Sequence, residues 1–185
     1  MDLLSDNRLM LKVKEGDLDQ LGLLFERYHR ILFKFFYNFH GNAALSEDQV
    51  QNVFERILKY RARFKGEGEF KAWMFFIARN INIDHYKKKK IKHTEDIDAW
   101  EDKIQNKELT TEAIMKQEEL ELLQEALQKL DQDKREILIL SKLDGMPYKE
   151  IAALLGCTEG TVKVRVFRAL QSLKKMYALL DDNNF

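Results

Sequence analysis

Apolar residues recur at every third or fourth position along most of this chain, which is the spacing that places them on one face of an α-helix. In the first half, this pattern predicts a pair of helices over residues 6–40, a helix over 46–63 and another that ends in the lysines of 87–90. Ser46, followed three residues later by glutamine, has the spacing of a capping box and is the predicted N-cap of the helix over 46–63. Two closely spaced glycines predict a loop over residues 64–70.

The periodicity stops between residues 91 and 111 and resumes at Ile114, which predicts a connector followed by a second group of helices. The sharpest feature of this group is a pair of short helices separated by a turn at Gly156. Pro147 is acceptable at the start of the first of these helices, because its missing N–H would have no partner there. Thr158 is the predicted N-cap of the second. Two helices joined by a short turn that contains glycine form the helix-turn-helix unit.

Composition narrows the fold class. The chain has 185 residues, of which 45% are hydrophobic, so it can bury a core and is not wholly disordered. One proline and eight glycines are too few for a loop-rich all-β protein, and runs rich in Leu, Lys, Glu, Gln and Ala favour helix. We therefore expect an all-α fold of two small helical domains, residues 1–92 and 112–185, joined by a flexible acidic linker over 93–111.

The formal net charge of zero is the sum of three unequal parts. Residues 1–92 have 18 Lys and Arg against 12 Asp and Glu, a net charge of +6, whereas residues 93–130 have 4 against 11, a net charge of −7. Residues 131–185 have 9 against 8, a net charge of +1. Aromatic residues are distributed just as unevenly along the chain, since 15 of the 20 precede residue 93. A basic, aromatic half and an acidic connector favour two functional bodies, although chance clustering on solvated faces explains the charges equally well.

The helix that follows Thr158 has the residue types of a DNA-reading helix. A helical wheel places an apolar set on its inner face, namely Val162, Val166, Ala169, Leu170 and Leu173. The candidate DNA-binding residues of this helix are Thr161, Lys163, Val164, Arg165, Phe167 and Arg168. Arginine can pair with guanine in the major groove, and a valine or phenylalanine edge can touch a thymine methyl group. The alternative is an amphipathic surface helix whose cations interact with its C-terminal dipole.

The segment from Tyr148 to Leu170 reads YKEIAALLGCTEGTVKVRVFRAL. It closely resembles the fourth conserved region of bacterial RNA polymerase sigma factors, in particular the small two-domain extracytoplasmic-function (ECF) group. The resemblance implies that the helix-turn-helix reads the minus-thirty-five promoter element. The family pattern has a serine where this chain has Val164, and we expect this departure to change which base is read and not whether DNA is bound.

The first half resembles the second conserved region of the same family. Residues 47–54, EDQVQNVF, are similar to the segment that binds the polymerase clamp, and residues 70–86, FKAWMFFIARNINIDHY, to the segment that melts and reads the minus-ten element. By this resemblance the polymerase-binding residues are Asp48, Gln51, Asn52 and Phe54. The residues for minus-ten recognition and melting are Phe64, Lys65, Phe70, Lys71, Trp73, Arg79, Asn80, Asn82, Tyr86 and Lys87. By the same resemblance, the glycine-containing loop from Phe64 to Ala72 would form the pocket for a flipped non-template base.

These observations predict a sigma factor that binds core RNA polymerase, at the clamp of the β′ subunit, and promoter DNA, with an anti-sigma factor as a further expected partner. The basic, aromatic first half fits this prediction, because strand opening needs cations for the backbone and aromatic faces for unstacked bases. The main alternative is a helix-turn-helix regulator that binds duplex DNA without melting it. Such a regulator would not require the segment at 70–86.

Neither catalysis nor a cofactor, metal or small-molecule substrate is expected. The four histidines and the single cysteine, Cys157, have no metal-binding spacing, and no P-loop or nucleophile elbow occurs. A nucleic-acid enzyme, the other alternative, would need a carboxylate or metal constellation, which we do not find. No apolar run approaches the length of a membrane span, and the first residues lack a secretory pattern, so we expect a cytoplasmic protein with no direct membrane insertion.

Overall fold

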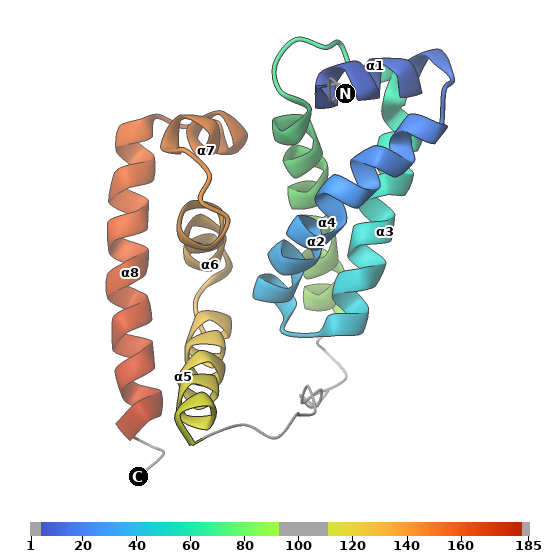
Figure 1. Ribbon diagram of the computed structural model, residues 1–185. Coiled ribbons are helices and arrows are strands. Elements are labelled where there is room, and N and C mark those ends of the chain that lie inside the picture. Colours follow the sequence, from blue (N-terminus) through green and yellow to red (C-terminus); the bar gives the residue numbers. More distant parts are fainter. Residues whose placement is uncertain (1–4, 93–110, 183–185) are drawn as a thin grey trace. The chain divides into compact units, whose positions relative to one another are not determined.

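The computed structural model describes residues 5–92 and 111–182 of the chain. All regular elements in these two ranges are helices, which confirms the predicted all-α fold (Figure 1). The chain divides into two compact units, Met1–Phe36 with Asn42–Trp100 and Tyr37–Gly41 with Glu101–Phe185. Residues 93–110, which make up nearly all of the predicted linker, lie outside the described residues. The flexibility of the linker and the exact domain boundaries therefore stay predictions.

Within residues 5–92, the helices follow the predicted order. They are α1 (Asp6–Glu15), α2 (Asp19–His40), α3 (Ala43–Tyr60), the 3-10 turn η1 (Arg61–Arg63) and α4 (Phe70–Lys92). The break between α1 and α2 occurs at Gly16, which adopts a φ of 108°. A left-handed backbone of this kind is strained for residues with a side chain, so glycine is the favoured residue at this helix end.

The start of α3 differs from the prediction. Its N-cap is Asn42, four residues before Ser46, and the Asn42 side chain accepts a hydrogen bond from the Leu45 N–H at 2.8 Å. Ser46 lies inside the helix and is fully buried, and its hydroxyl donates to the Asn42 carbonyl oxygen at 2.6 Å. Asparagine is as good an N-cap as serine, and the earlier cap adds a turn of helix, which is why the capping-box spacing misplaced the boundary.

The core of the first unit is rich in phenylalanine. Phe35 of α2 meets Phe75 of α4 edge-on, with ring centroids 5.5 Å apart, and both rings are almost fully buried. Such pairs contribute about 0.5–1.5 kcal/mol beyond the burial of their area. Because α4 packs against α3 as well as α2, it buries more than one stripe of residues.

Within residues 111–182, the helices are α5 (Thr111–Gln128), α6 (Gln132–Leu138), the π-helical turn η2 (Ile139–Leu143), α7 (Tyr148–Leu155) and α8 (Glu159–Asp181). The long helix α8 packs against α5, α6 and α7, so it forms one side of the unit (Figure 1). The π-helical turn η2 follows α6 directly, so the helical backbone widens after Leu138.

A buried arginine holds the corner between α5 and α6. Arg135 is 8% exposed, and its guanidinium donates to the carbonyl oxygens of Leu127 and Leu130 at 3.0 Å each. It also donates to the backbone and side-chain oxygens of Gln128. These carbonyls lie at the C-terminal end of α5, where the helix leaves acceptors without intrahelical donors. A single side chain therefore satisfies them and compensates the negative end of the helix dipole.

None of the helices in the described ranges combines the length and the apolar character that crossing a membrane requires.

Candidate nucleic-acid interface

The helix-turn-helix of the second unit forms as the sequence predicts. Gly156 ends α7 in the left-handed conformation, with a φ of 63°. Two residues later, Thr158 caps α8, because its hydroxyl oxygen accepts a hydrogen bond from the Thr161 N–H at 3.2 Å. The two helices pack through small and branched residues that are nearly or fully buried, namely Ile151, Ala152, Val162, Val166 and Ala169. This packing fixes the direction in which α8 presents its outer face.

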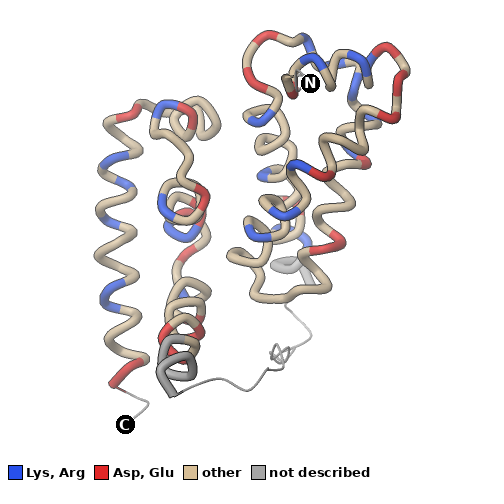
Figure 2. Tube along the Cα trace, viewed as in Figure 1, with Lys and Arg blue, Asp and Glu red and all other residues tan. Residues whose placement is uncertain are grey.

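The outer face of α8 is basic and apolar together. Lys163, Arg165 and Arg168 are exposed, and between them Val164 is 49% and Phe167 61% exposed. Figure 2 shows Lys and Arg at successive turns of α8, with acidic residues only at its two ends. A large aromatic side chain that lies among cations and is exposed to water is typical of a surface that binds a partner.

Two residues of α8 differ from their predicted places. Thr161 is half-buried, and its hydroxyl lies 3.0 Å from that of Thr158, so it belongs to the cap of the helix as much as to its outer face. Leu170, predicted inside, is 40% exposed. It lies at the border of the inner face on the helical wheel, where a single helix pattern cannot decide which side the residue takes.

In the first unit, the candidate pocket is the loop between η1 and α4. Lys65 is exposed, Lys71 and Trp73 are half-exposed, and the Trp73 ring packs against the rings of Phe64 and Phe70, with centroids 5.3 and 6.3 Å away. Phe64 is only 3% exposed and Phe70 is fully buried. Neither ring is open to a base in this conformation, and contact of Phe64 or Phe70 with DNA stays a prediction. They anchor the two ends of the loop in the core.

Along α4, the predicted residues divide into two groups. Arg79, Asn80 and Tyr86 are half-exposed and Lys87 is exposed, so all four can reach a ligand. Asn82 is fully buried, and its two amide atoms have no hydrogen-bond partner among the described residues. In this structure α4 turns Asn82 toward the interior, and its predicted contact with DNA is not tested by this burial.

Two features that sequence reasoning missed lie beside these residues. Phe76 is 49% exposed and stands one helical turn from Asn80 on the outer side of α4. At the end of α3, the guanidinium of Arg63 and the ammonium of Lys59 lie 4.8 and 5.5 Å from the ring centroid of Tyr60. The signal in the sequence is the alternation of basic and aromatic residues over 59–65, KYRARFK, which leads directly into the loop.

The candidate polymerase-binding residues lie on α3. Asp48, Gln51 and Asn52 are exposed, and their spacing of three and four places them on one face of the helix. Phe54 is only 7% exposed, and its ring packs against that of Phe25, with centroids 4.9 Å apart. Phe54 therefore packs in the core of this structure, and its predicted contact with polymerase stays a prediction.

The described residues bring together no group of three or more His, Cys, Asp or Glu side chains that could hold a metal ion. Tyr28 of α2 has a perturbed pKa. Burial, together with the hydrogen bond that its hydroxyl donates to Asp6, raises the pKa of Tyr28 far above its usual range. This tyrosine belongs to the support of the loop and not to the exposed surface.

Each unit matches a protein-family model. The model described as Sigma-70 region 2 matches residues 24–91, and the model described as Sigma-70, region 4 matches residues 120–173. Curated relatives agree. The ECF RNA polymerase sigma factor EcfG of Rhodopseudomonas palustris is 36% identical over 136 residues, which cover 74% of this chain and 73% of the relative. The ECF RNA polymerase sigma factor SigX of Bacillus subtilis is 30% identical over 163 residues, or 85% of this chain and 84% of the relative.

Solved structures give the same result. The structure of CnrH in complex with the cytosolic domain of CnrY matches with a TM-score of 0.71 at 26% identity, over 96% of this chain and 97% of that one. The sigma factor RpoE, solved with the anti-sigma factor NepR from Bartonella quintana, shares the fold with a TM-score of 0.67 at 24% identity, over 84% and 94% of the two chains. The two units match the family models in the order in which sigma factors have these regions, and relatives of this class match over most of their length. The chain therefore belongs to the ECF RNA polymerase sigma factors, which direct transcription initiation.

Proposed function

We propose that this chain binds core RNA polymerase, directs it to a set of promoters and opens their minus-ten elements. The main support for the proposal is that each of the two units has an exposed surface of basic and aromatic residues. The two units match regions 2 and 4, in that order. In this role the chain is not an enzyme, because polymerase performs the chemistry and the chain positions it. Its place of action is the cytoplasm, where bacterial polymerase works.

The outer face of α8 is the proposed reader of the minus-thirty-five element. Arg168 and Arg165 suit guanine, or phosphate where no base is within reach, and Val164 and Phe167 suit a thymine methyl group. Lys163 suits a phosphate, because its ammonium is a point charge on a flexible stem. Thr161 sits at the start of the helix, where backbone N–H groups also favour a phosphate.

The loop before α4 and the outer side of α4 are the proposed site for the opened minus-ten strand. The exposed or half-exposed members of the predicted set are Lys65, Lys71, Trp73, Arg79, Asn80, Tyr86 and Lys87, and we add Arg63 and Phe76 as candidates. Stacking of an unpaired base on an aromatic side chain contributes about 1–3 kcal/mol, which is comparable to the cost of unstacking it from the duplex. The exposed cations supply the contacts with phosphates.

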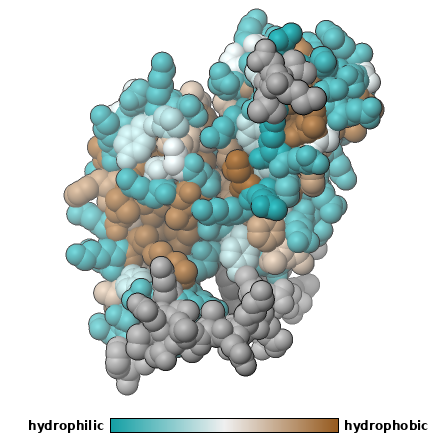
Figure 3. Space-filling view, viewed as in Figure 1, coloured by the Kyte–Doolittle hydropathy of each residue, from teal (hydrophilic) through white to brown (hydrophobic). Residues whose placement is uncertain are grey.

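Two protein partners complete the proposal. Asp48, Gln51 and Asn52 form the face of α3 that we assign to the clamp of the β′ subunit. An anti-sigma factor is the second partner, a proposal supported by the solved complex of the related CnrH with the cytosolic domain of CnrY. Large apolar side chains are exposed on the second unit, among them Leu120, Leu123 and Leu179, and Figure 3 shows apolar side chains gathered on this unit. A surface of this kind suits a protein partner.

Transcription from a genomic library tests this function. Core polymerase with the protein, but not core polymerase alone, should give run-off transcripts from a defined set of fragments. The competing hypothesis of a duplex-binding regulator predicts tight and specific binding of the protein alone to promoter DNA, with no new transcripts. Transcription without any dependence on the added protein would contradict the proposal.

A further inference from the structure

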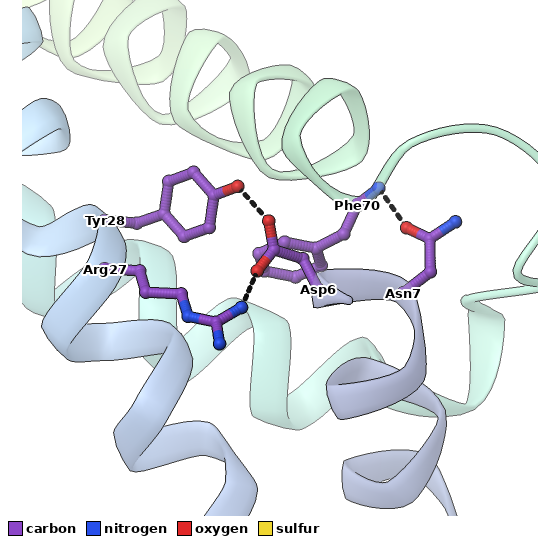
Figure 4. A network of polar contacts seen from close by, with 5 residues as sticks. All are labelled: Asp6, Asn7, Arg27, Tyr28 and Phe70. Carbon is purple, nitrogen blue, oxygen red and sulfur yellow. Dashed lines mark hydrogen bonds and ion pairs between the residues drawn. The ribbon is translucent and has the colours of Figure 1, made fainter. Parts of the chain in front are cut away.

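The short helix α1 holds the loop that precedes α4, as Figure 4 shows for Asn7. The side-chain amide of Asn7 makes two hydrogen bonds with the loop backbone. Its Nδ2 donates to the Gly68 carbonyl oxygen at 2.7 Å, and its Oδ1 accepts from the Phe70 N–H at 2.7 Å. One side chain therefore fixes the peptide groups on both sides of Glu69 and the first N–H of α4.

Two further residues of α1 contact the same loop. The ammonium of Lys14 donates to the Phe64 carbonyl oxygen at 2.7 Å, which holds the other end of the loop. Between the two ends, a Cβ added to Gly66 would lie 3.5 Å from the terminal carbons of Leu11, so the Leu11 side chain rests against the middle of the loop. Residues spaced three and four apart on one face of α1 thus contact the start, the middle and the end of the loop.

Helix α1 is itself held rigidly. Leu9, Met10 and Val13 are fully buried, and the Asp6 carboxylate accepts hydrogen bonds from Tyr28 and from Arg27 of α2, the latter at 2.5 Å (Figure 4). The Tyr28 ring also meets the Phe70 ring edge-on, with centroids 5.6 Å apart. A helix anchored in this way presents Asn7, Leu11 and Lys14 at fixed positions.

The loop needs such a template because its own backbone is permissive. Gly66 and Gly68 adopt φ values of 76° and 86°, and a glycine populates both signs of φ with similar ease. The hydrogen bonds from Asn7 and Lys14 come from outside the loop and hold the backbone on both sides of these glycines. The hydrogen bonds go to backbone atoms, which leaves the exposed side chains of Lys65, Glu67 and Glu69 available to a ligand.

We infer that α1 is a positioning element for promoter recognition: Asn7 and Lys14 set the shape of the loop over 64–69 and thereby its preference among bases of the opened minus-ten strand. This inference rests on the proposed function and deepens it. Asn7 and Lys14 act through the loop backbone and do not touch the base themselves. Their loss should change selectivity at one promoter element and leave the binding of polymerase unchanged.

The test uses holoenzyme reconstituted from core polymerase and the full chain, with a pool of duplexes randomised over the promoter region. Opened complexes are selected and sequenced. Asn7→Ala and Lys14→Met should each flatten the base preference in the minus-ten element by about fivefold, as the loss of one or two hydrogen bonds implies. Both should keep the preference in the minus-thirty-five element and the affinity for core polymerase. Asn7→Asp, which keeps the acceptor for Phe70 and loses the donor to Gly68, should fall between Asn7→Ala and the wild type.

Arg8→Met is the matched control, because it removes one exposed positive charge from the same helix. It should select the same bases as the wild type. Hydrogen exchange of the peptide over 64–72 in the free, full-length protein gives a readout that does not depend on promoters, and Asn7→Ala should accelerate it. Faster exchange with an unchanged minus-ten preference would overturn the inference, as would an equal loss of preference in both promoter elements. If the wild-type holoenzyme enriches no sequence, the proposed function fails, whereas the exchange result still reports whether α1 holds the loop.

Discussion

Tyr28 and Asp6 form the contact by which a single titratable side chain influences the stability of the first unit. Burial of Tyr28, its hydrogen bond to Asp6 and the charge of Asp6 all disfavour the tyrosinate and raise the pKa of Tyr28. Because the pKa of Tyr28 is higher in the folded state than its ordinary value of about 10, the contribution of Tyr28 to stability is fully present below about pH 10. This contribution is lost as the pH rises above that value.

We therefore expect the free energy of unfolding of the wild type to fall between about pH 10 and pH 11, whereas Tyr28→Phe should show a weaker dependence on pH. At neutral pH the same variant should be less stable by about 2 kcal/mol, the typical value of a hydrogen bond to a charged group. Urea unfolding followed by circular dichroism at several pH values measures both. An equally steep alkaline loss in Tyr28→Phe would show that the hydroxyl does not cause it.

Asn82 gives a second prediction for a single residue. Its amide is buried and has no hydrogen-bond partner among the described residues, which costs about 1–3 kcal/mol. Asn82→Leu replaces it with an apolar side chain of the same branched shape and should raise the free energy of unfolding by about 1 kcal/mol. Because Asn82 is buried, we expect normal promoter opening by this variant. A loss of stability, measured by thermal unfolding, would show that the amide is satisfied in solution.

These residues show where a sequence pattern stops being informative. A helical wheel of α4 cannot decide which of Phe75 and Phe76 is buried, because adjacent residues of the same type differ only in the neighbouring helices that they meet. Phe75 is buried because Phe35 of α2 meets it, and Phe76 is exposed. Similarly, Phe64 points inward against Trp73, and Phe70 points inward against Tyr28. The loop separates the first pair along the chain, and the second pair is far apart in sequence, so a local pattern shows neither contact.

At the scale of one element, we expect some side chains of α8 to contact bases and others to contact phosphates. Arg168→Ala should weaken promoter binding by about 1–3 kcal/mol and relax selectivity at one position of the minus-thirty-five element, if the guanidinium pairs with a base. Lys163→Ala should weaken binding of all sequences alike and reduce the salt slope by about one, as the loss of a phosphate contact requires. Titrations of holoenzyme with promoter DNA at several salt concentrations separate the two. The same salt slope and the same selectivity in both variants would contradict the assignment.

Elements whose ends carry strong local signals were predicted well. Gly156 and Thr158 end α7 and begin α8 as expected, because a left-handed glycine and a capping hydroxyl act through the backbone of their own neighbours. Asn42 was missed as the cap of α3, since Ser46 offered a competing signal four residues later. The role of Arg135 at the end of α5 could not be predicted, because its partners belong to the preceding helix and become neighbours only when α5 and α6 pack.

For the whole molecule, the account predicts two independent sets of contacts. Changing Asp48 and Gln51 together to Ala should weaken the complex with core polymerase and leave the DNA contacts of the second unit intact. Arg168→Ala should do the reverse, because the two sites belong to separate units and their effects should be nearly additive. Glu26→Ala removes an exposed carboxylate from α2 and is the control. A pull-down with core polymerase measures the effect, and normal retention of the Asp48/Gln51 variant would disprove the assignment of this face.

The division into two functional bodies could be read from the sequence because each body carries its own motif and its own composition. The basic and aromatic first half and the helix-turn-helix of the second correspond to the two family models. The connector could be recognised only by its lack of periodicity and by its acidic residues. Its part in spacing the two DNA contacts stays a prediction, since residues 93–110 lie outside the part of the chain that the structure describes.

The central claim is that this chain both recognises promoters and opens them with polymerase, and permanganate footprinting tests it most directly. Permanganate oxidises thymines that are unpaired and unstacked. On promoters selected from the genomic library, the holoenzyme should make thymines of the minus-ten element reactive, whereas the protein alone and core polymerase alone should not. Reactive thymines that appear only with the complete holoenzyme are the result the account predicts. Specific binding of the protein to these promoters with no reactive thymine on any of them would contradict it and favour a regulator that leaves the duplex closed.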